Sequence, residues 1–185
     1  MTDNLIEEIS AKYNRGIVYV ITGNGKGKTT AALGLALRAL GHGRKVFIVQ
    51  FMKGRKYGEV LAAESYLPGI TIRQCGLDSF VMRDNPAPVD IDLACQGLSL
   101  AAEAISTGGY DMVILDEINV ALDFKLVSLT EVLELIRTRP ASVDLVLTGR
   151  CAPDEIIDAA DTVSDIQDIK HHYSQGIKER AGMEF

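Results

Sequence analysis

The nine residues 22–30, TGNGKGKTT, decide the fold of this chain, because they join a β-rich run to a helical run. The run before them is IVYVIT, residues 17–22, and the run after them is AALGLALRAL, residues 31–40. A strand, a glycine-rich loop and a helix in this order form a phosphate-binding loop, whose backbone N–H groups curl toward an anion. The helix N-terminus adds its partial positive charge. A glycine-rich turn that binds nothing is the alternative interpretation.

Each residue type in the loop has an expected task in nucleotide binding. The glycines let the backbone approach the phosphates, Lys28 reaches those phosphates, and the hydroxyl of Thr29 binds a metal ion. Lys28 and Thr29 are therefore also expected to be catalytic. The residues expected to contact the nucleotide are Thr22, Gly23, Asn24, Gly25, Lys26, Gly27, Lys28, Thr29 and Thr30.

The loop departs from the strict phosphate-loop pattern at its first position. Thr22 stands five residues before Gly27, where the strict pattern has a glycine. This departure predicts an altered loop and leaves the orientation of the nucleotide open. The dinucleotide fingerprint G-x-G-x-x-G is excluded, because Lys28 occupies the place of its third glycine. Lys26 is expected either to contact a phosphate or to face water.

Short β-rich runs alternate with helical runs along the rest of the chain. Strands are expected at residues 17–22, 45–51, 70–74, 110–116 and 143–149, and helices at 28–40, 89–107, 129–138 and 154–160. Near-continuous apolar strands are typical of a parallel sheet that is covered on both faces. We therefore expect an α/β fold of the P-loop NTPase type: a mostly parallel twisted sheet with helices on both faces and a ligand crevice at the carboxyl ends of the strands. Ser128 and Glu131 predict a capping box for the third helix.

Two acidic residues end the fourth predicted strand, YDMVILDE, residues 110–117. Asp116 and Glu117 should lie beside the loop, and carboxylate oxygens suit a Mg²⁺ ion that is shared with phosphates. The predicted metal ligands are Thr29, Asp116 and Glu117, with Mn²⁺ as an alternative ion and Glu117 as a further catalytic candidate. Which carboxylate binds the metal directly stays open, and an ordinary strand end is the alternative.

Basic and amide side chains are expected at the same edge of the sheet. Lys53 follows the second strand and Arg150 follows the fifth, so each is a candidate phosphate ligand. A solvated strand end is the alternative for both. Asn119 is either a turn residue or a partner of the site residues.

Composition and charge exclude several classes of protein. The chain has 185 residues, 47% of them hydrophobic and 24% charged, and a formal net charge of −6. This length fits one domain, and the acidic balance predicts no binding to nucleic acid. The longest apolar run is too short for a membrane span, and the start MTDNLIEE is unlike a signal peptide. We therefore expect a cytoplasmic protein with no membrane association.

The chain from Arg15 to Phe185 resembles the P-loop type of ATP:corrinoid adenosyltransferase. The resemblance rests on the TGNGKGKTT variant, on QFMKG at residues 50–54, on ILDEIN at 114–119, on VLTGR at 146–150, and on KHHYSQGIKERAGMEF at 170–185. It implies that ATP and a reduced corrinoid are the substrates. The Co(I) ion attacks C5′ of the ribose, triphosphate leaves, and no general base is needed. It also implies that ATP lies reversed relative to its orientation in kinases.

The resemblance further implies a corrinoid contact, partners and an arm. In CGLDSFVMRD, residues 75–84, Phe80 matches an aromatic position that faces the corrin, while Met82 departs from the family's aromatic residue. A core position is the alternative for Phe80. Residues 1–15 resemble a helical arm and residues 16–185 a single nucleotide-binding domain, with a homodimer and an electron-donor flavoprotein as partners. A phosphotransferase or ATPase of other specificity, and a nucleotide-dependent switch or assembly protein, are the alternative functions.

Overall fold

A computed structural model describes residues 15–184, and their strands form one six-stranded parallel sheet. The order across the sheet is β3-β2-β4-β5-β1-β6, and every pair of neighbours is parallel. The strands are β1 (Val18–Thr22), β2 (Val46–Phe51), β3 (Ile70–Cys75), β4 (Met112–Asp116), β5 (Asp144–Thr148) and β6 (Thr162–Asp165). The expected α/β fold is confirmed. The predicted arm, apart from its last residue, lies outside the described residues.

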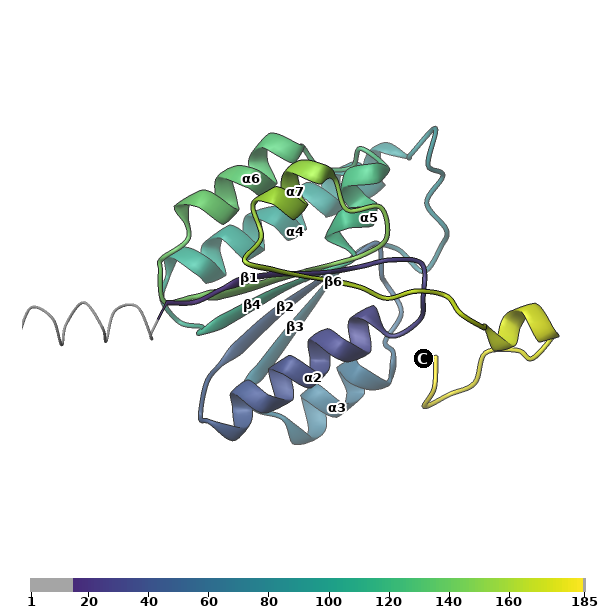
Figure 1. The fold of residues 1–185 in the computed structure, drawn as a ribbon, viewed down its shortest axis with the longest axis horizontal. Coiled ribbons are helices and arrows are strands. Elements are labelled where there is room, and N and C mark those ends of the chain that lie inside the picture. The colour runs from purple at the N-terminus through teal and green to yellow at the C-terminus, as the bar shows by residue number, and fades with distance from the viewer. Residues whose placement is uncertain (1–14, 185) are drawn as a thin grey trace, which may run out of the picture.

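Helices cover both faces of the sheet (Figure 1). They are α2 (Lys28–Gly41), α3 (Gly58–Tyr66), α4 (Pro88–Ser106), α5 (Ile118–Asp123), α6 (Leu129–Thr138), α7 (Asp154–Asp158) and the 3₁₀ helix η1 (His172–Gln175). Helices α2 and α3 lie on one face, and α4, α5, α6 and α7 lie on the other. Among residues 15–184, no helix is long and apolar enough to cross a membrane.

The alternation of side chains along the strands divides the core into two layers. In β4, Val113 and Leu115 are buried with the α4 and α6 side of the core, while Met112 and Ile114 are buried with the α2 side. Successive residues of a strand point to opposite faces, so β1 to β5 each supply side chains to both layers. This double burial explains why the strands read as continuous apolar runs.

Four short elements and one cap differ from the sequence-based expectation. The sequence pattern does not predict the edge strand β6, helices α3 and α5 or the 3₁₀ helix η1, whereas α6 has the predicted bounds. The predicted capping box at α6 is wrong, because the Ser128 side chain makes no capping hydrogen bond. At the start of α4, the Asp90 carboxylate accepts a hydrogen bond from the N–H of Ala87, at 3.1 Å.

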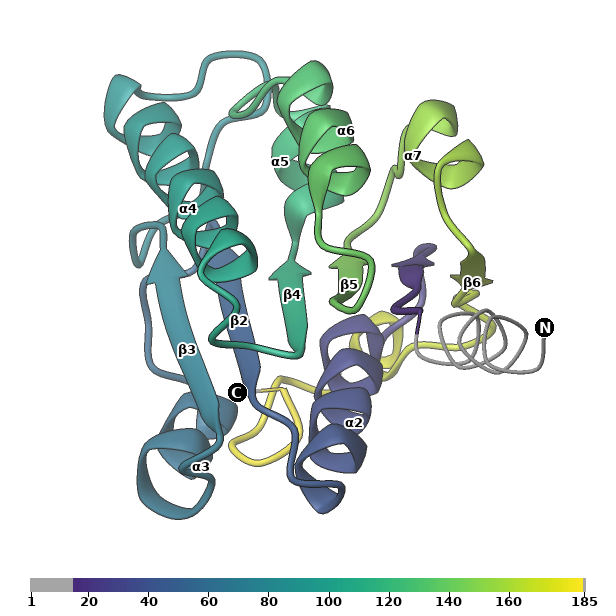
Figure 2. The same cartoon turned by 90° about the vertical axis from the view of Figure 1, so that its left-hand side faces the viewer.

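The parallel arrangement places all strand ends that carry site residues at one edge of the sheet. Because β1, β4 and β5 are neighbours or lie one strand apart, the turns that follow them are close in space. Figure 2 shows the sheet from the side, with α5, α6 and α7 above the β4, β5 and β6 ribbons. The C-terminal segment after β6 then turns back toward the start of α2 (Figure 1).

Candidate active site

The glycine-rich loop between β1 and α2, which the sequence predicts to bind phosphate, holds the ammonium group of Lys28 at its centre. Lys28 Nζ donates hydrogen bonds of 2.7 Å to the carbonyl oxygens of both Gly23 and Gly25. Burial lowers the pKa of Lys28, and the charge of Glu117 opposes this effect. Gly27 has φ 112° and precedes the first residue of α2, so the loop enters the helix through a conformation that favours glycine. This geometry directs the helix N-terminus and a buried cation toward one small space.

The segment that follows β6 packs against the loop and is hydrogen-bonded to it. The N–H of Gly25 donates to the carbonyl of Ile166 at 2.7 Å, and the N–H of Ile166 donates to the carbonyl of Thr22 at 2.9 Å. A Cβ atom on Gly23 would collide with the Asp165 carboxylate, and one on Gly25 would collide with the backbone of residue 167. These two glycines are therefore required by close chain packing, in addition to any approach of a phosphate.

The carboxylate of Asp116 is the centre of the polar network behind the loop. Its Oδ1 accepts hydrogen bonds from Thr29 Oγ1 and Thr148 Oγ1, each at 2.8 Å. Its Oδ2 accepts from Lys53 Nζ at 2.8 Å and from Gln50 Nε2 at 3.2 Å. The side chain is only 1% exposed, so these four donors replace the water that a carboxylate needs. The structure thus brings the predicted residues Thr29, Lys53 and Asp116 together.

Lys53 lies between Asp116 and a second carboxylate. Burial lowers the pKa of Lys53, but the charge and hydrogen bond of Asp116 and the charges of Glu117 and Glu59 together outweigh this effect and raise the pKa. Glu59, on α3, adds its charge from 3.9 Å. The ammonium also lies 5.8 Å from the centre of the Tyr57 ring. In the structure, Lys53 is therefore an ion-pair partner of Asp116 at the wall of the site.

Glu117 occupies an unusual turn between β4 and α5. Its φ is 67°, and its N–H donates to Thr148 Oγ1 at 2.9 Å. Burial raises the pKa of its carboxyl group, the charge of Asp116 raises it further, and Lys53 opposes both. No hydrogen bond from another residue in the range 15–184 reaches this carboxyl group. Glu117 therefore presents free oxygen atoms to the loop.

Two adjoining cavities meet at the loop. The first, of about 370 Å³, is lined by the loop, Glu117, Arg150, His171, Met183 and Glu184. The second, of about 540 Å³, lies over Lys53, Tyr57 and Glu59. Both cavities are bordered by Thr29, Thr30, Met183 and Glu184. The site is thus partly divided by the C-terminal segment.

Lys26 is paired with an acidic residue of that segment. Its ammonium makes an ion pair with Glu184, whose carboxylate also accepts from the N–H of Arg180 at 2.7 Å and lies 3.3 Å from His172 Nε2. The hydrogen bonds from Lys26 and Arg180 lower the pKa of Glu184. The two alternatives expected for Lys26, a phosphate contact or water, did not include this ion pair, and its side chain is 37% exposed.

Phe80 and Met82 stand on the long connection between β3 and α4. Both side chains are exposed, so the alternative that Phe80 belongs to the core is wrong. The start of this connection is packed on the turn that follows β2, because a Cβ atom on Gly76 would collide with the backbone of Lys53. Its far part is joined to the end of α5 by an ion pair of 2.6 Å between Arg83 and Asp123. The two apolar side chains therefore lie at the carboxyl edge of the sheet.

Comparison with known proteins identifies the family. A family model described as "ATP:corrinoid adenosyltransferase BtuR/CobO/CobP" matches residues 14–185. The chain belongs to the ATP:corrinoid adenosyltransferase family. Members of this family adenosylate corrinoids with ATP, so the chain is a transferase with ATP and a corrinoid as its substrates.

Curated relatives of this adenosyltransferase cover nearly the whole chain. The corrinoid adenosyltransferase of Pseudomonas aeruginosa is 38% identical over 176 residues, which are 95% of this chain and 86% of the relative. The corrinoid adenosyltransferase of Escherichia coli K12 is 35% identical over 176 residues, which are 95% and 88% of the two chains. The Salmonella typhimurium protein, also called corrinoid adenosyltransferase, is 35% identical over 178 residues, which are 95% and 88% of the two chains.

Several polar partners in this adenosyltransferase were missed by sequence reasoning. Gln50 and Thr148 bind Asp116 directly, and Glu59 accepts a hydrogen bond from Gln50 Nε2 at 2.9 Å. A signal was present for two of them, because Gln50 and Thr148 interrupt apolar strands near their carboxyl ends. Glu59 lies on a helix that was not expected and carries no such signal.

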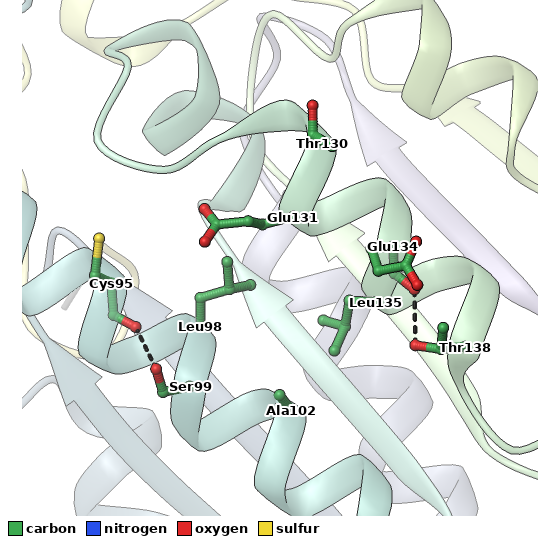
Figure 3. A pocket seen from close by; sticks show the side chains of 9 residues that line it. All are labelled: Cys95, Leu98, Ser99, Ala102, Thr130, Glu131, Glu134, Leu135 and Thr138. Carbon is green, nitrogen blue, oxygen red and sulfur yellow. Dashed lines mark hydrogen bonds between the residues drawn. The ribbon is translucent and has the colours of Figure 1, made fainter.

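A separate groove of about 500 Å³ lies between α4 and α6, on the sheet face that α4 to α7 cover (Figure 3). Its floor is apolar, with Leu98, Ala102 and Leu135, and the carboxylates of Glu131 and Glu134 stand on the α6 side. None of the described residues that line it is basic. An anionic nucleotide is therefore disfavoured here, and the charge pattern supports the loop as the substrate site.

Proposed function

We propose that this adenosyltransferase binds ATP with the triphosphate in the loop of residues 22–30 and the ribose directed out of it. The observation that carries the proposal is the Lys28 ammonium, buried among the Gly23 and Gly25 carbonyls at a helix N-terminus. Such a buried cation is ready to exchange two carbonyl partners for phosphate oxygens. Nucleotide contacts then extend over Thr22 to Thr30, with Arg150 at the border of the first cavity and Lys53 at the border of the second.

The reaction needs an electron pair, an open carbon and a stabilised leaving group. The Co(I) electron pair forms the bond to C5′, the bond between C5′ and its oxygen breaks, and that oxygen leaves with its electrons as part of triphosphate. Charge grows on the leaving oxygen, so the loop N–H groups and Lys28 stabilise the transition state by being in place beforehand. The metal-centred nucleophile carries no proton, and no side chain has to act as a base.

The oxygen groups beside the loop fit a divalent cation. Thr29 Oγ1 lies 2.8 Å from Asp116 Oδ1, and the free carboxyl group of Glu117 faces the same cavity. Hydroxyl and carboxylate oxygens are the ligands that Mg²⁺ prefers, and Mn²⁺ suits them as well. When bound, such an ion withdraws negative charge from the triphosphate. Because Asp116 already accepts from four donors, we assign direct coordination to Thr29 and Glu117 and a supporting contact to Asp116.

The corrinoid is proposed to lie against the connection that carries Phe80 and Met82. Both side chains are exposed and apolar, and the connection that carries them starts against the turn of Lys53. Apolar groups against one face of the corrin disfavour a water ligand on cobalt, because water there would lose its hydrogen bonds. A cobalt ion without that ligand is reduced more easily from Co(II) to Co(I).

We also propose an oligomeric state, an electron donor and a cellular location for the enzyme. Residues 1–15 act as an arm of a homodimer, the electron for Co(II) comes from a flavoprotein, and the enzyme works in the cytoplasm in cobalamin synthesis or salvage. The homodimer, the flavoprotein and the role in cobalamin metabolism are supported by the similarity of the chain to its family over residues 14–185. The arm and the cytoplasmic location are supported by the sequence alone.

One anaerobic assay tests the proposed chemistry. Chemically reduced cobalamin is mixed with the protein and MgATP, and the corrin spectrum and the phosphate products are followed together. The expected result is the spectrum of adenosylcobalamin with an equal amount of inorganic triphosphate. Release of ADP with an unchanged corrin spectrum contradicts the proposal and favours a phosphotransferase or ATPase.

A further inference from the structure

Two hydrogen bonds fasten the start of α5 to the end of β5. The N–H of Glu117 donates to Thr148 Oγ1 at 2.9 Å, and Asn119 Nδ2 donates to the carbonyl oxygen of Gly149 at 3.3 Å. Glu117 precedes α5, and Arg150 directly follows Gly149. The two bonds therefore hold one acidic and one basic residue of the loop cavity in register with each other.

The turn that carries Arg150 has an unusual backbone that is packed on α5. Gly149 has φ 127°, and Cys151 has φ 58°. A Cβ atom on residue 149 would lie 3.0 Å from the N atom of Val120 and 3.1 Å from Asn119 Cβ. The close contact leaves the turn little freedom, and the Asn119 amide is its polar attachment to α5.

The burial of Asn119 is not explained by stability. The residue is fully buried, and its Oδ1 has no hydrogen-bond partner among residues 15–184. A buried acceptor without a partner costs folding free energy, and an apolar side chain of similar size would avoid that cost. Local costs of this kind are typical of functional sites.

The charge of Arg150 acts on both sides of the loop cavity. The charge of Arg150 lowers the pKa of Lys28, and only burial and the charge of Glu117 have larger effects on this pKa. It also lowers the pKa of Glu117, against the larger effects of burial and Asp116. A small shift of the turn would therefore change the field at the place where phosphates bind.

We infer that Asn119 is a positioning residue that holds the Arg150 turn against α5, so that the guanidinium meets the triphosphate opposite Glu117. The inference rests on the proposed function, in which Arg150 contacts phosphate. Asn119 itself is buried behind the turn and acts through the Gly149 carbonyl.

A double-mutant cycle on triphosphate binding tests the inference. The Kd of inorganic tripolyphosphate with Mg²⁺ is measured by calorimetry for the full chain, for Asn119→Leu, for Arg150→Ala and for the double variant. Asn119→Leu should weaken binding about tenfold, the scale of coupling between contacting residues. In the Arg150→Ala background the same change should have no further effect. Additive losses, or an unchanged Kd for Asn119→Leu, overturn the inference.

Further arms separate the possible causes of failure. If Arg150→Ala leaves the Kd unchanged, the proposed phosphate contact of Arg150 is wrong, and the inference falls with it. If Arg150→Ala weakens binding and Asn119→Leu does not, only the inference is wrong. Should Asn119→Leu fail to fold, Asn119→Ala enters the same cycle with the same expected results. Arg137→Ala, which removes an exposed cation on α6, is the control for net charge and should bind normally.

Discussion

The ammonium of Lys53 lies 2.8 Å from Oδ2 of Asp116, in an ion pair whose acidic partner is 1% exposed and whose basic partner is 17% exposed. The pair joins the turn after β2 to the end of β4. All four hydrogen-bond donors to Asp116 come from the protein chain itself.

Removal of this cation should destabilise the protein. Lys53→Met leaves the Asp116 carboxylate buried with neutral donors only, and we expect the free energy of unfolding to fall by about 3 kcal/mol. Guanidinium unfolding at neutral pH measures the change. Lys56→Met removes an exposed lysine that is paired with Glu64, and it should change stability by less than about 0.5 kcal/mol. Equal losses of unfolding free energy in the two variants would mean that the buried ion pair contributes no more to stability than the exposed one.

Glu117 should lower the stability of the protein at neutral and basic pH. Folding raises the pKa of this group above its ordinary value of 4.5, so its protonated form favours the folded state. That advantage is full below the ordinary pKa and is lost as pH rises through the raised one. Glu117→Gln stays neutral at every pH and should therefore be more stable than the natural protein at about pH 8, with the difference vanishing toward about pH 4.

Urea unfolding across this pH range checks the prediction, and adenosyl transfer is measured in parallel. Transfer by Glu117→Gln should fall, because a neutral amide is a poorer metal ligand than a carboxylate. A variant that is less stable than the natural protein at high pH contradicts the sign of the effect.

Lys28 should contribute to catalysis by stabilising the leaving triphosphate. Lys28→Ala should reduce kcat/KM by an amount that corresponds to about 2–4 kcal/mol of transition-state stabilisation, the scale for one preorganised donor. Steady-state kinetics with chemically reduced cobalamin measures the loss, and circular dichroism shows whether the fold is kept. Full activity of a folded Lys28→Ala would show that the loop is not the phosphate site.

Phe80 should matter for the reduction of cobalt and little for folding. Because the side chain is exposed, Phe80→Ala should leave the melting temperature unchanged within about 2 °C. Transfer to chemically made Co(I) should continue at the natural rate, while turnover that starts from Co(II) and an enzymatic reductant should slow. Equal losses in the two assays would remove Phe80 from a role at the cobalt ligand.

The sequence predicts the main elements of the fold because hydrophobic burial dominates them. Strands β1, β2, β4 and β5 bury side chains on both faces, and α6 has a clear apolar stripe with buried Val132, Leu135 and Ile136. Strand β6, TVSD, is a short edge strand with mostly exposed side chains, so it reads as a loop. Helix α5 begins directly after Glu117, which has a left-handed backbone, and no loop separates it from β4.

The sequence predicts those parts of the site that come from short local motifs. The loop, Asp116 and Glu117 follow from residues that are close in the sequence. The links of Asp116 to Gln50 and Thr148 arise from strand pairing across the sheet, and a local pattern contains no such information. The same holds for the pair of Lys26 with Glu184, which are 158 positions apart.

Residues 165–167 pack against Gly23 and Gly25, so the conformation of the loop at residues 22–30 depends on segments from both ends of the domain. A chain shortened just after α7 would still contain the sequence TGNGKGKTT, but it would lack β6 and the residues after it that pack on this loop. To keep its conformation in another parallel sheet, the loop would therefore have to be transferred together with β6.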